Sequence, residues 1–150
     1  MATSKEIRNR IYNILNDMTA VGGTAKTVAK HIPHAMADYE GYVFRVRATN
    51  SLNSRQSRET RNENQTWLIE LFSPKINIGF YDEKEDNMYD YRDAVIAEFE
   101  RKTRLTYGGA SLTGVGSALI PDDRFTWGDT EFNLRYKWQC TLNLENRVIC

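Results

Sequence analysis

The chain has 150 residues, and its 20 Lys and Arg balance 20 Asp and Glu, so its formal net charge is zero. This length fits one domain, residues 1–150, and the balanced charge excludes the global field of a general nucleic-acid or membrane-surface binder. No apolar run approaches the roughly 20 residues that cross a bilayer, and polar residues 1–10 argue against a secretory signal. We therefore expect a soluble protein without a membrane partner.

The first expected element is an amphipathic helix. Thr3 and Glu6 stand three residues apart, which is the spacing of a capping box. Apolar residues then follow at helical spacing, at Ile7, Ile11, Ile14, Leu15 and Met18. We expect this helix to end near residues 21–23, where two glycines follow a valine.

The next segments favour strands. Val28 and Ile32 indicate a short extended piece, because Pro33 opposes a helix running through it. Two stretches show the two-residue period of strands with two different faces. Over 42–47 one face has Tyr42, Phe44 and Val46 and the other Val43, Arg45 and Arg47; over 67–72 one face has Trp67, Ile69 and Leu71 and the other Leu68, Glu70 and Phe72.

A polar segment of about 16 residues separates these two strands, far more than the two to five expected of a hairpin loop. Residues 49–66 contain a single leucine, Leu52. One interpretation is a solvated loop, and the other is an arm that becomes ordered only against a partner. The interface candidates in this loop are Arg55, Arg58, Glu59, Arg61 and Glu63.

A second helix is expected to begin with a cap at Asp86 or Asn87. Its apolar face consists of Met88, Tyr91, Val95, Ile96 and Phe99. Basic residues close it, where they suit the negative end of the helix dipole. A strand is expected within residues 112–120, followed by turn residues at 121–123 and 127–129.

The clearest pattern is unbroken alternation over residues 132–145. Its apolar side consists of Phe132, Leu134, Tyr136, Trp138, Cys140, Leu142 and Leu144. At about 3.3 Å per residue, this single strand would run roughly 40 Å. The pattern predicts an α+β fold, with a mainly antiparallel sheet packed on two helices on one face and a long C-terminal strand. The polar side, with Arg135, Lys137 and Gln139, is a candidate face toward a channel or another subunit.

Catalytic and metal-binding patterns are weak. His31 and His34 flank Pro33, which spoils the helical geometry that would aim both at one ion. Asp122 and Glu131 resemble part of a metal-dependent nuclease site, but no lysine stands where that chemistry requires it. We expect no enzyme activity, no metal and no cofactor. Cys140 and Cys150 are expected to be free thiols in a reducing compartment.

The order of elements resembles the tail terminator (tail completion) proteins of long-tailed bacteriophages. The similar stretches are residues 5–15, 42–47, 67–71, 93–100 and 132–136. The resemblance implies a structural virion protein that caps the tail tube as a homo-hexameric ring, ends tail polymerisation and provides the surface for head attachment. Its implied partners are other copies of itself, the tail tube protein and a head-completion or neck protein. Assembly would take place in the host cytoplasm, and DNA passing through the lumen could make non-specific contacts.

Three alternatives stay open. The first is another head–tail connector or head-completion protein of the same small α+β format. The second is a small metal-dependent hydrolase that uses Asp122, Glu131 and His31 or His34. The third is a nucleic-acid-binding module, although the basic residues are too few to support sequence-specific recognition.

Overall fold

The computed structural model describes residues 3–21, 26–29, 41–55, 60–74, 81–102, 104–110, 115–119, 124–126 and 135–149. Its elements are α1 (Ser4–Asp17), β1 (Lys26–Ala29), β2 (Tyr42–Arg55), β3 (Thr60–Phe72), α2 (Tyr81–Arg101), β4 (Val115–Leu119), β5 (Arg124–Thr126) and β6 (Lys137–Ile149). The strands form one sheet in the order β1-β2-β3-β6-β4, with β5 also paired to β6. β1 runs parallel to β2, and the other pairs are antiparallel. The predicted α+β class is confirmed.

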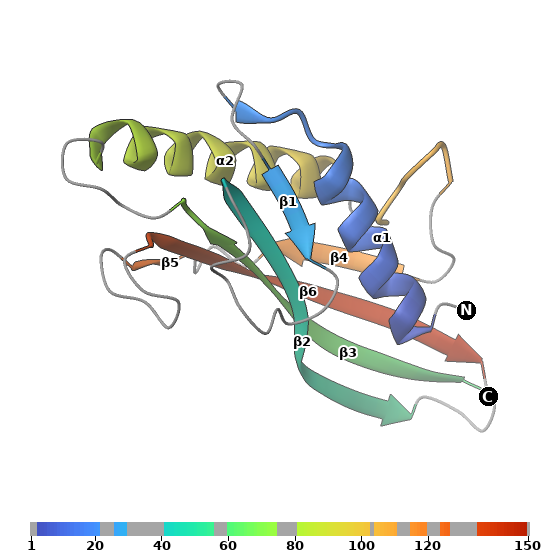
Figure 1. The fold of residues 1–150 in the computed structure, drawn as a ribbon. Coiled ribbons are helices and arrows are strands. Elements are labelled where there is room, and N and C mark those ends of the chain that lie inside the picture. The colour runs from blue at the N-terminus through green and yellow to red at the C-terminus, as the bar shows by residue number, and fades with distance from the viewer. Residues whose placement is uncertain are drawn as a thin grey trace.

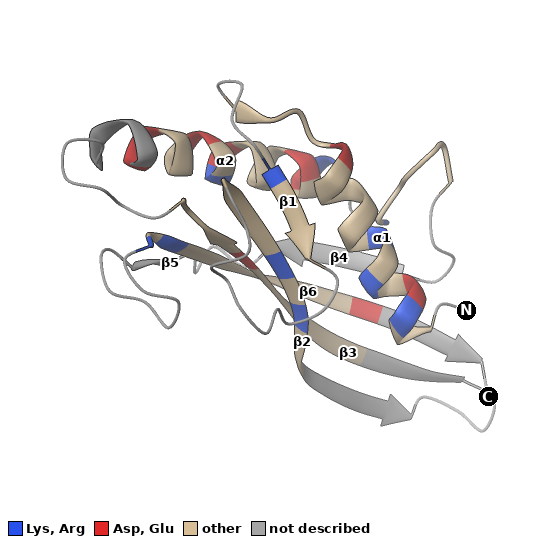
Figure 2. Ribbon diagram, in the orientation of Figure 1, with Lys and Arg blue, Asp and Glu red and all other residues tan. Residues whose placement is uncertain are grey.

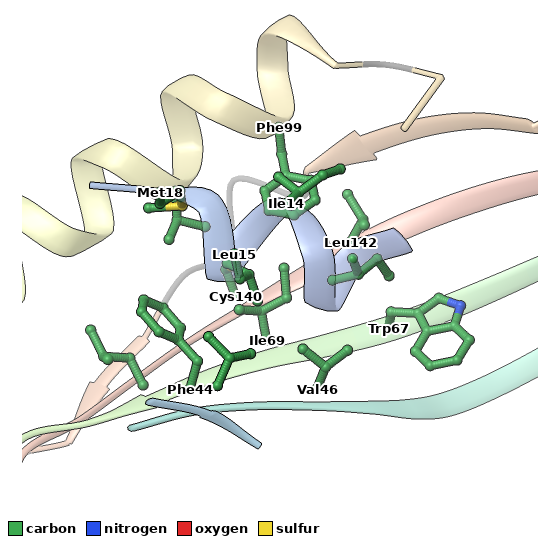
Figure 3. Packing of buried hydrophobic residues seen from close by; sticks show 14 of the residues in the cluster. Ile14, Leu15, Met18, Phe44, Val46, Trp67, Ile69, Phe99, Cys140 and Leu142 are labelled. Atoms are coloured by element: carbon green, nitrogen blue, oxygen red, sulfur yellow. The ribbon is translucent and has the colours of Figure 1, made fainter. Parts of the chain in front are cut away.

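Both helices cover the same face of the sheet (Figure 1). This helix-covered face buries the apolar side of each long strand against the helices. Tyr91 of α2 packs tilted on Tyr42 at 5.0 Å between ring centroids and edge-on to Phe44 at 5.7 Å. Figure 3 shows Ile14 and Leu15 of α1 and Phe99 of α2 meeting Ile69 and other side chains of the sheet. The apolar positions predicted for both helices are confirmed in the core, except that Ile96 is only half-buried.

The capping box predicted at the start of α1 is present, with the Glu6 amide donating to the Thr3 hydroxyl at 3.1 Å. The helix ends at Asp17, earlier than the predicted residues 21–23, because Met18 already has an extended backbone. Its last turn contains no basic residue. Instead, Lys26 of β1 donates to the carbonyls of Leu15 at 2.8 Å, Asn16 at 3.2 Å and Met18.

We expect Lys26→Met to lower the free energy of unfolding by about 1–2 kcal/mol, because three carbonyls at the negative end of α1 lose a charged donor. Burial lowers the pKa of Lys26, and Asp17 partly opposes this effect. Urea denaturation would measure the loss. Lys102→Met is the matched control, since Lys102 forms a partly exposed ion pair with Glu98, and it should lose no more than about 0.5 kcal/mol. Equal losses would contradict the capping role.

The second helix begins at Tyr81, so the predicted start at Asp86 or Asn87 is wrong. The first turns of α2 lack apolar periodicity, and their acidic residues instead suit the positive end of a helix dipole. After α2, buried Leu105 adopts a left-handed backbone with φ 50°. Its carbonyl accepts a hydrogen bond from Arg10 at 2.8 Å, which joins α1 to this turn.

The predicted long loop between the second and third strands is wrong over most of its length. β2 continues to Arg55, and β3 begins at Thr60. The two strands stay in register from Asn50↔Thr66 to Arg55↔Arg61, beyond a bulge at residues 48–50. β3 is paired with β6 along its whole length, from Thr60↔Ile149 to Phe72↔Lys137. Pairing with β6 therefore orders a polar segment that has no apolar alternation of its own.

The long C-terminal strand is present but displaced along the sequence. β6 covers Lys137–Ile149, whereas the predicted alternation began at residue 132. Residues 132–134 lie outside the described part of the chain. The alternation itself is confirmed from Tyr136 onward: Trp138 and Leu142 are fully buried, and Cys140 is a buried free thiol. Cys150 lies outside the described residues.

The short elements were harder to predict. The strand expected within residues 112–120 is β4, Val115–Leu119, and β5 was not predicted. Val28 lies in β1, whereas Ile32 falls outside the described residues. At the Tyr107–Ala110 turn, Gly108 and Gly109 have φ values of 61° and 80°, which glycine adopts without strain.

Candidate assembly surface

The sheet face opposite the helices contains a buried carboxylate among three cations. Glu70 in β3 has no exposed surface, and its neighbour across the strand pair is Arg45. Arg45 donates to both carboxylate oxygens, from Nε at 2.8 Å and from Nη2 at 2.7 Å. Lys137 of β6 lies 2.9 Å from Oε2, and Arg47 Nε lies 3.0 Å from Oε1. We call these four residues the Glu70 cluster.

The Glu70 cluster holds its carboxylate ionised. Burial by itself raises the pKa of Glu70, but hydrogen bonds and charges from Arg45 and Lys137 outweigh it, so the pKa lies below its usual value. One negative charge thus faces three positive ones. The excess positive charge also faces the Phe72 ring in cation–π contacts. The centroid of this ring lies 5.3 Å from the Arg45 guanidinium and 5.6 Å from the Lys137 ammonium group.

The three cations of the Glu70 cluster differ in how much of each side chain is exposed. The Arg45 side chain is 2% exposed, Lys137 18% and Arg47 41%. Arg45 is therefore an internal partner of Glu70. Arg47 and Lys137 carry the surplus positive charge to the surface of this sheet face.

The three predicted seam residues have different surroundings. Arg135 is buried, at 2% exposure, and donates from Nη1 to the Ser73 carbonyl at 2.8 Å. Ser73 also connects the end of β3 to the start of β6, because its hydroxyl accepts a hydrogen bond from the Tyr136 amide at 2.9 Å. Arg135 thus stabilises this end of the sheet. Lys137 belongs to the Glu70 cluster, and Gln139 is half-buried. This sheet face becomes exposed only further along β6, at Asn143 and Glu145.

The predicted loop residues lie on the extended strands where they are described. Arg55 is the last residue of β2 and faces Arg61 of β3, with Glu63 two positions further along β3. Arg58 and Glu59 fall outside the described residues. The helix-covered core stops close to Gln65, which is buried and bonded to Trp67 at 2.8 Å and to Ser4 of α1 at 3.1 Å. Beyond that point β2, β3 and β6 continue together, and past Asn146, the last residue of β6 that pairs with β4, they form a three-stranded extension (Figure 1).

The candidate catalytic residues of the hydrolase alternative cannot be located in the described part of the chain. His31, His34, Asp122 and Glu131 all lie outside it. Among the residues that are described, no group of three or more His, Cys, Asp or Glu could hold a metal ion. Neither described helix is long and apolar enough to cross a membrane.

Sequence reasoning missed Glu70 as the centre of this surface. Alternation placed Arg45, Arg47 and Glu70 opposite the core, and this placement is confirmed. Whether these three residues contact Lys137 depends on how β2 pairs with β3 and β3 with β6. These registers are set by the tertiary structure. A buried glutamate opposite an arginine on adjacent predicted strands was the available signal.

No family model matches this chain, and no curated protein sequence matches it. Among solved structures, a chain described as "Virion of native gene transfer agent (GTA) particle" has the same fold, with a TM-score of 0.57. The two are 12% identical, and the match covers 95% of each chain. The class that fold and surface define is thus an α+β fold like that of this virion chain, with a charged sheet face and long projecting strands.

Proposed function

We propose that this protein is a structural component of a phage-like virion. The observation that carries the proposal is the fold match. It covers 95% of each chain, and the matching chain belongs to an assembled virion. The described surface supports it, because long strands project beyond the core and charged groups gather on one sheet face. Assembly requires surfaces of this kind and no catalytic group.

Within the virion we propose the role of tail terminator, a ring of six copies that caps the tail tube, ends its polymerisation and receives the neck. The order of elements supports this role, with a capped first helix, a long strand pair, a second helix and a final long strand. A ring requires two different complementary patches on each subunit. We propose no enzyme activity.

Light scattering after size exclusion, with and without tail tube protein, tests the role. The expected result is a ring-sized oligomer that binds tube ends and stops their growth in electron micrographs. A protein that stays monomeric and ignores tube ends would refute it. The second candidate, a head connector, is favoured by the same fold match, and particles lacking the protein separate the two. Overlong tails indicate a terminator, whereas intact tails beside leaking heads indicate a connector.

The three-stranded extension gives a further prediction. Residues 53–63 can be replaced by Asn-Gly, because Leu52 and Asn64 are paired and a two-residue turn of this type joins antiparallel strands. We expect circular dichroism and the melting temperature to change little, since the core stops near Gln65, whereas binding to tube ends or neighbouring subunits is lost. Full assembly by the shortened chain would contradict a role for the extension.

A further inference from the structure

Among the described residues, exposed acidic side chains gather on one side of α2, where Asp93 is paired with Arg92 at 2.8 Å, and the Glu70 cluster places cations on the far face of the sheet. On α2, the exposed positions Asp86, Tyr89, Asp90 and Asp93 recur at spacings of three and four residues, with half-buried Glu85 beside them. We call these five residues the α2 outer face. Figure 2 shows acidic positions along α2 and basic positions on β2 and β6. The opposite signs cannot meet within one copy, because α2 covers one face of the sheet and the Glu70 cluster lies on the other.

The α2 outer face also has an aromatic group at its centre. Tyr89 is 40% exposed and donates to the Glu85 carboxylate at 2.9 Å. This hydrogen bond, together with the charges of Glu85 and Asp86, raises the pKa of Tyr89. An exposed tyrosine among carboxylates suits a cationic partner, since the ring and the acids attract the same guanidinium or ammonium group. Tyrosine and arginine are also the residue types that most often anchor interfaces.

The Glu70 cluster offers the complementary group. Arg47 is the most exposed of its cations, and the ion pair between its Nε and Glu70 Oε1 at 3.0 Å keeps the guanidinium close to this sheet face. Lys137 adds a second positive charge that Glu70 also holds in place. Such preorganised charges lose less side-chain entropy on binding than free surface lysines.

We propose that copies of this chain join head to tail, with the α2 outer face of one copy against Arg47 and Lys137 of the next. Two different patches on opposite sides make a heterologous contact, which closes into a ring when the rotation between copies is suitable. The inference rests on the ring proposed above and names its seam. Because the groups are partly exposed, added salt should weaken the association.

Two single variants test the seam by sedimentation velocity on the full chain. We expect Asp90→Lys to weaken self-association at least about tenfold, because like charges then face each other. Arg47→Gln should do the same by removing the exposed cation. The matched controls are Glu100→Lys, an exposed acid about 15 Å further along α2, and Arg104→Gln, an exposed arginine. Both controls should associate as the native chain does, and melting curves check that each variant folds.

A mixture of the two variants gives the decisive result. Each variant alone blocks one patch, but Arg47 of the Asp90→Lys copy still meets Asp90 of the Arg47→Gln copy. The mixture should therefore form one-to-one heterodimers and nothing larger. A mixture that stays monomeric while the native chain associates overturns the inference, as does native-like assembly by both variants. In either case, native rings that cap tube ends would leave the proposed function standing, whereas a native chain that is monomeric beside tube ends refutes both.

Discussion

Glu70→Gln is expected to lower the free energy of unfolding by about 3–5 kcal/mol, as removal of one partner from a buried ion pair does. The variant leaves the Arg45 guanidinium, 2% exposed, without the carboxylate that accepts hydrogen bonds from its Nε and Nη2. It also leaves Lys137 and Arg47 beside a neutral amide. Urea denaturation followed by circular dichroism would measure the loss.

Glu98→Gln is the control for this substitution. Glu98 also lies beside two cations, Arg101 and Lys102, but it is 26% exposed on the surface of α2. Water screens such pairs, so we expect a change within about 1 kcal/mol. If the two substitutions cost the same, burial of the Glu70 cluster has no energetic consequence.

The same cluster makes stability depend on pH in the acid range. The pKa of Glu70 in the folded protein lies below its ordinary value of 4.5. The stabilisation is therefore complete above about pH 4.5 and is lost as the pH falls through the lower, folded-state pKa. Stability measured from pH 6 downward should fall less steeply for Glu70→Gln than for the native chain. Parallel curves would contradict the low pKa.

Trp138→Asp is expected to unfold the domain, with a loss beyond about 4–5 kcal/mol. Trp138 is fully buried on the helix-covered face of β6, between the register positions Leu71 and Phe125 on the neighbouring strands. An aspartate there would place an unpaired charge in the apolar core. Loss of the folded circular dichroism spectrum at 25 °C would show it, and Trp138→Ala, at about 3–5 kcal/mol, gives a measurable intermediate.

Lys137→Ala is the control on the other face of the same strand. The polar pattern alone predicts that this substitution leaves folding unchanged. Because Lys137 forms an ion pair with Glu70, we instead expect the free energy of unfolding to fall by about 1 kcal/mol. Arg135→Ala should cost more, because Arg135 is buried and donates to Ser73. Equal effects of Trp138→Asp and Lys137→Ala would refute the assignment of the two faces.

Local patterns predicted the parts of the fold in which each residue's environment follows from its neighbours in the chain. The capping box of α1 depends on residues three apart, and the core positions of both helices depend on helical spacing. The alternation from Tyr136 to Leu144 likewise follows from strand geometry alone. These features need no knowledge of the rest of the molecule.

Long-range pairing decided the features that sequence reasoning missed. Residues 60–66 are polar on both sides of the strand, so only their register with β6 shows that they extend the sheet. The α1 C-terminus is capped by Lys26 from another element, and α2 begins in a stretch without apolar periodicity. In each case the partner that stabilises the segment is distant in sequence.

The sequence by itself determined the fold class and the side of the three long strands that carries the core residues, because these follow from composition and short-range periodicity. Only the tertiary structure decided that Glu70 of β3 meets Arg45 and Arg47 of β2 and Lys137 of β6. It also decided that Arg135 is a buried brace, whereas Arg47 reaches the surface. The physical reason is that the register between neighbouring strands sets which charged side chains meet. The alternation of residues along one strand shows which face each side chain is on, but not which residue of the next strand lies beside it.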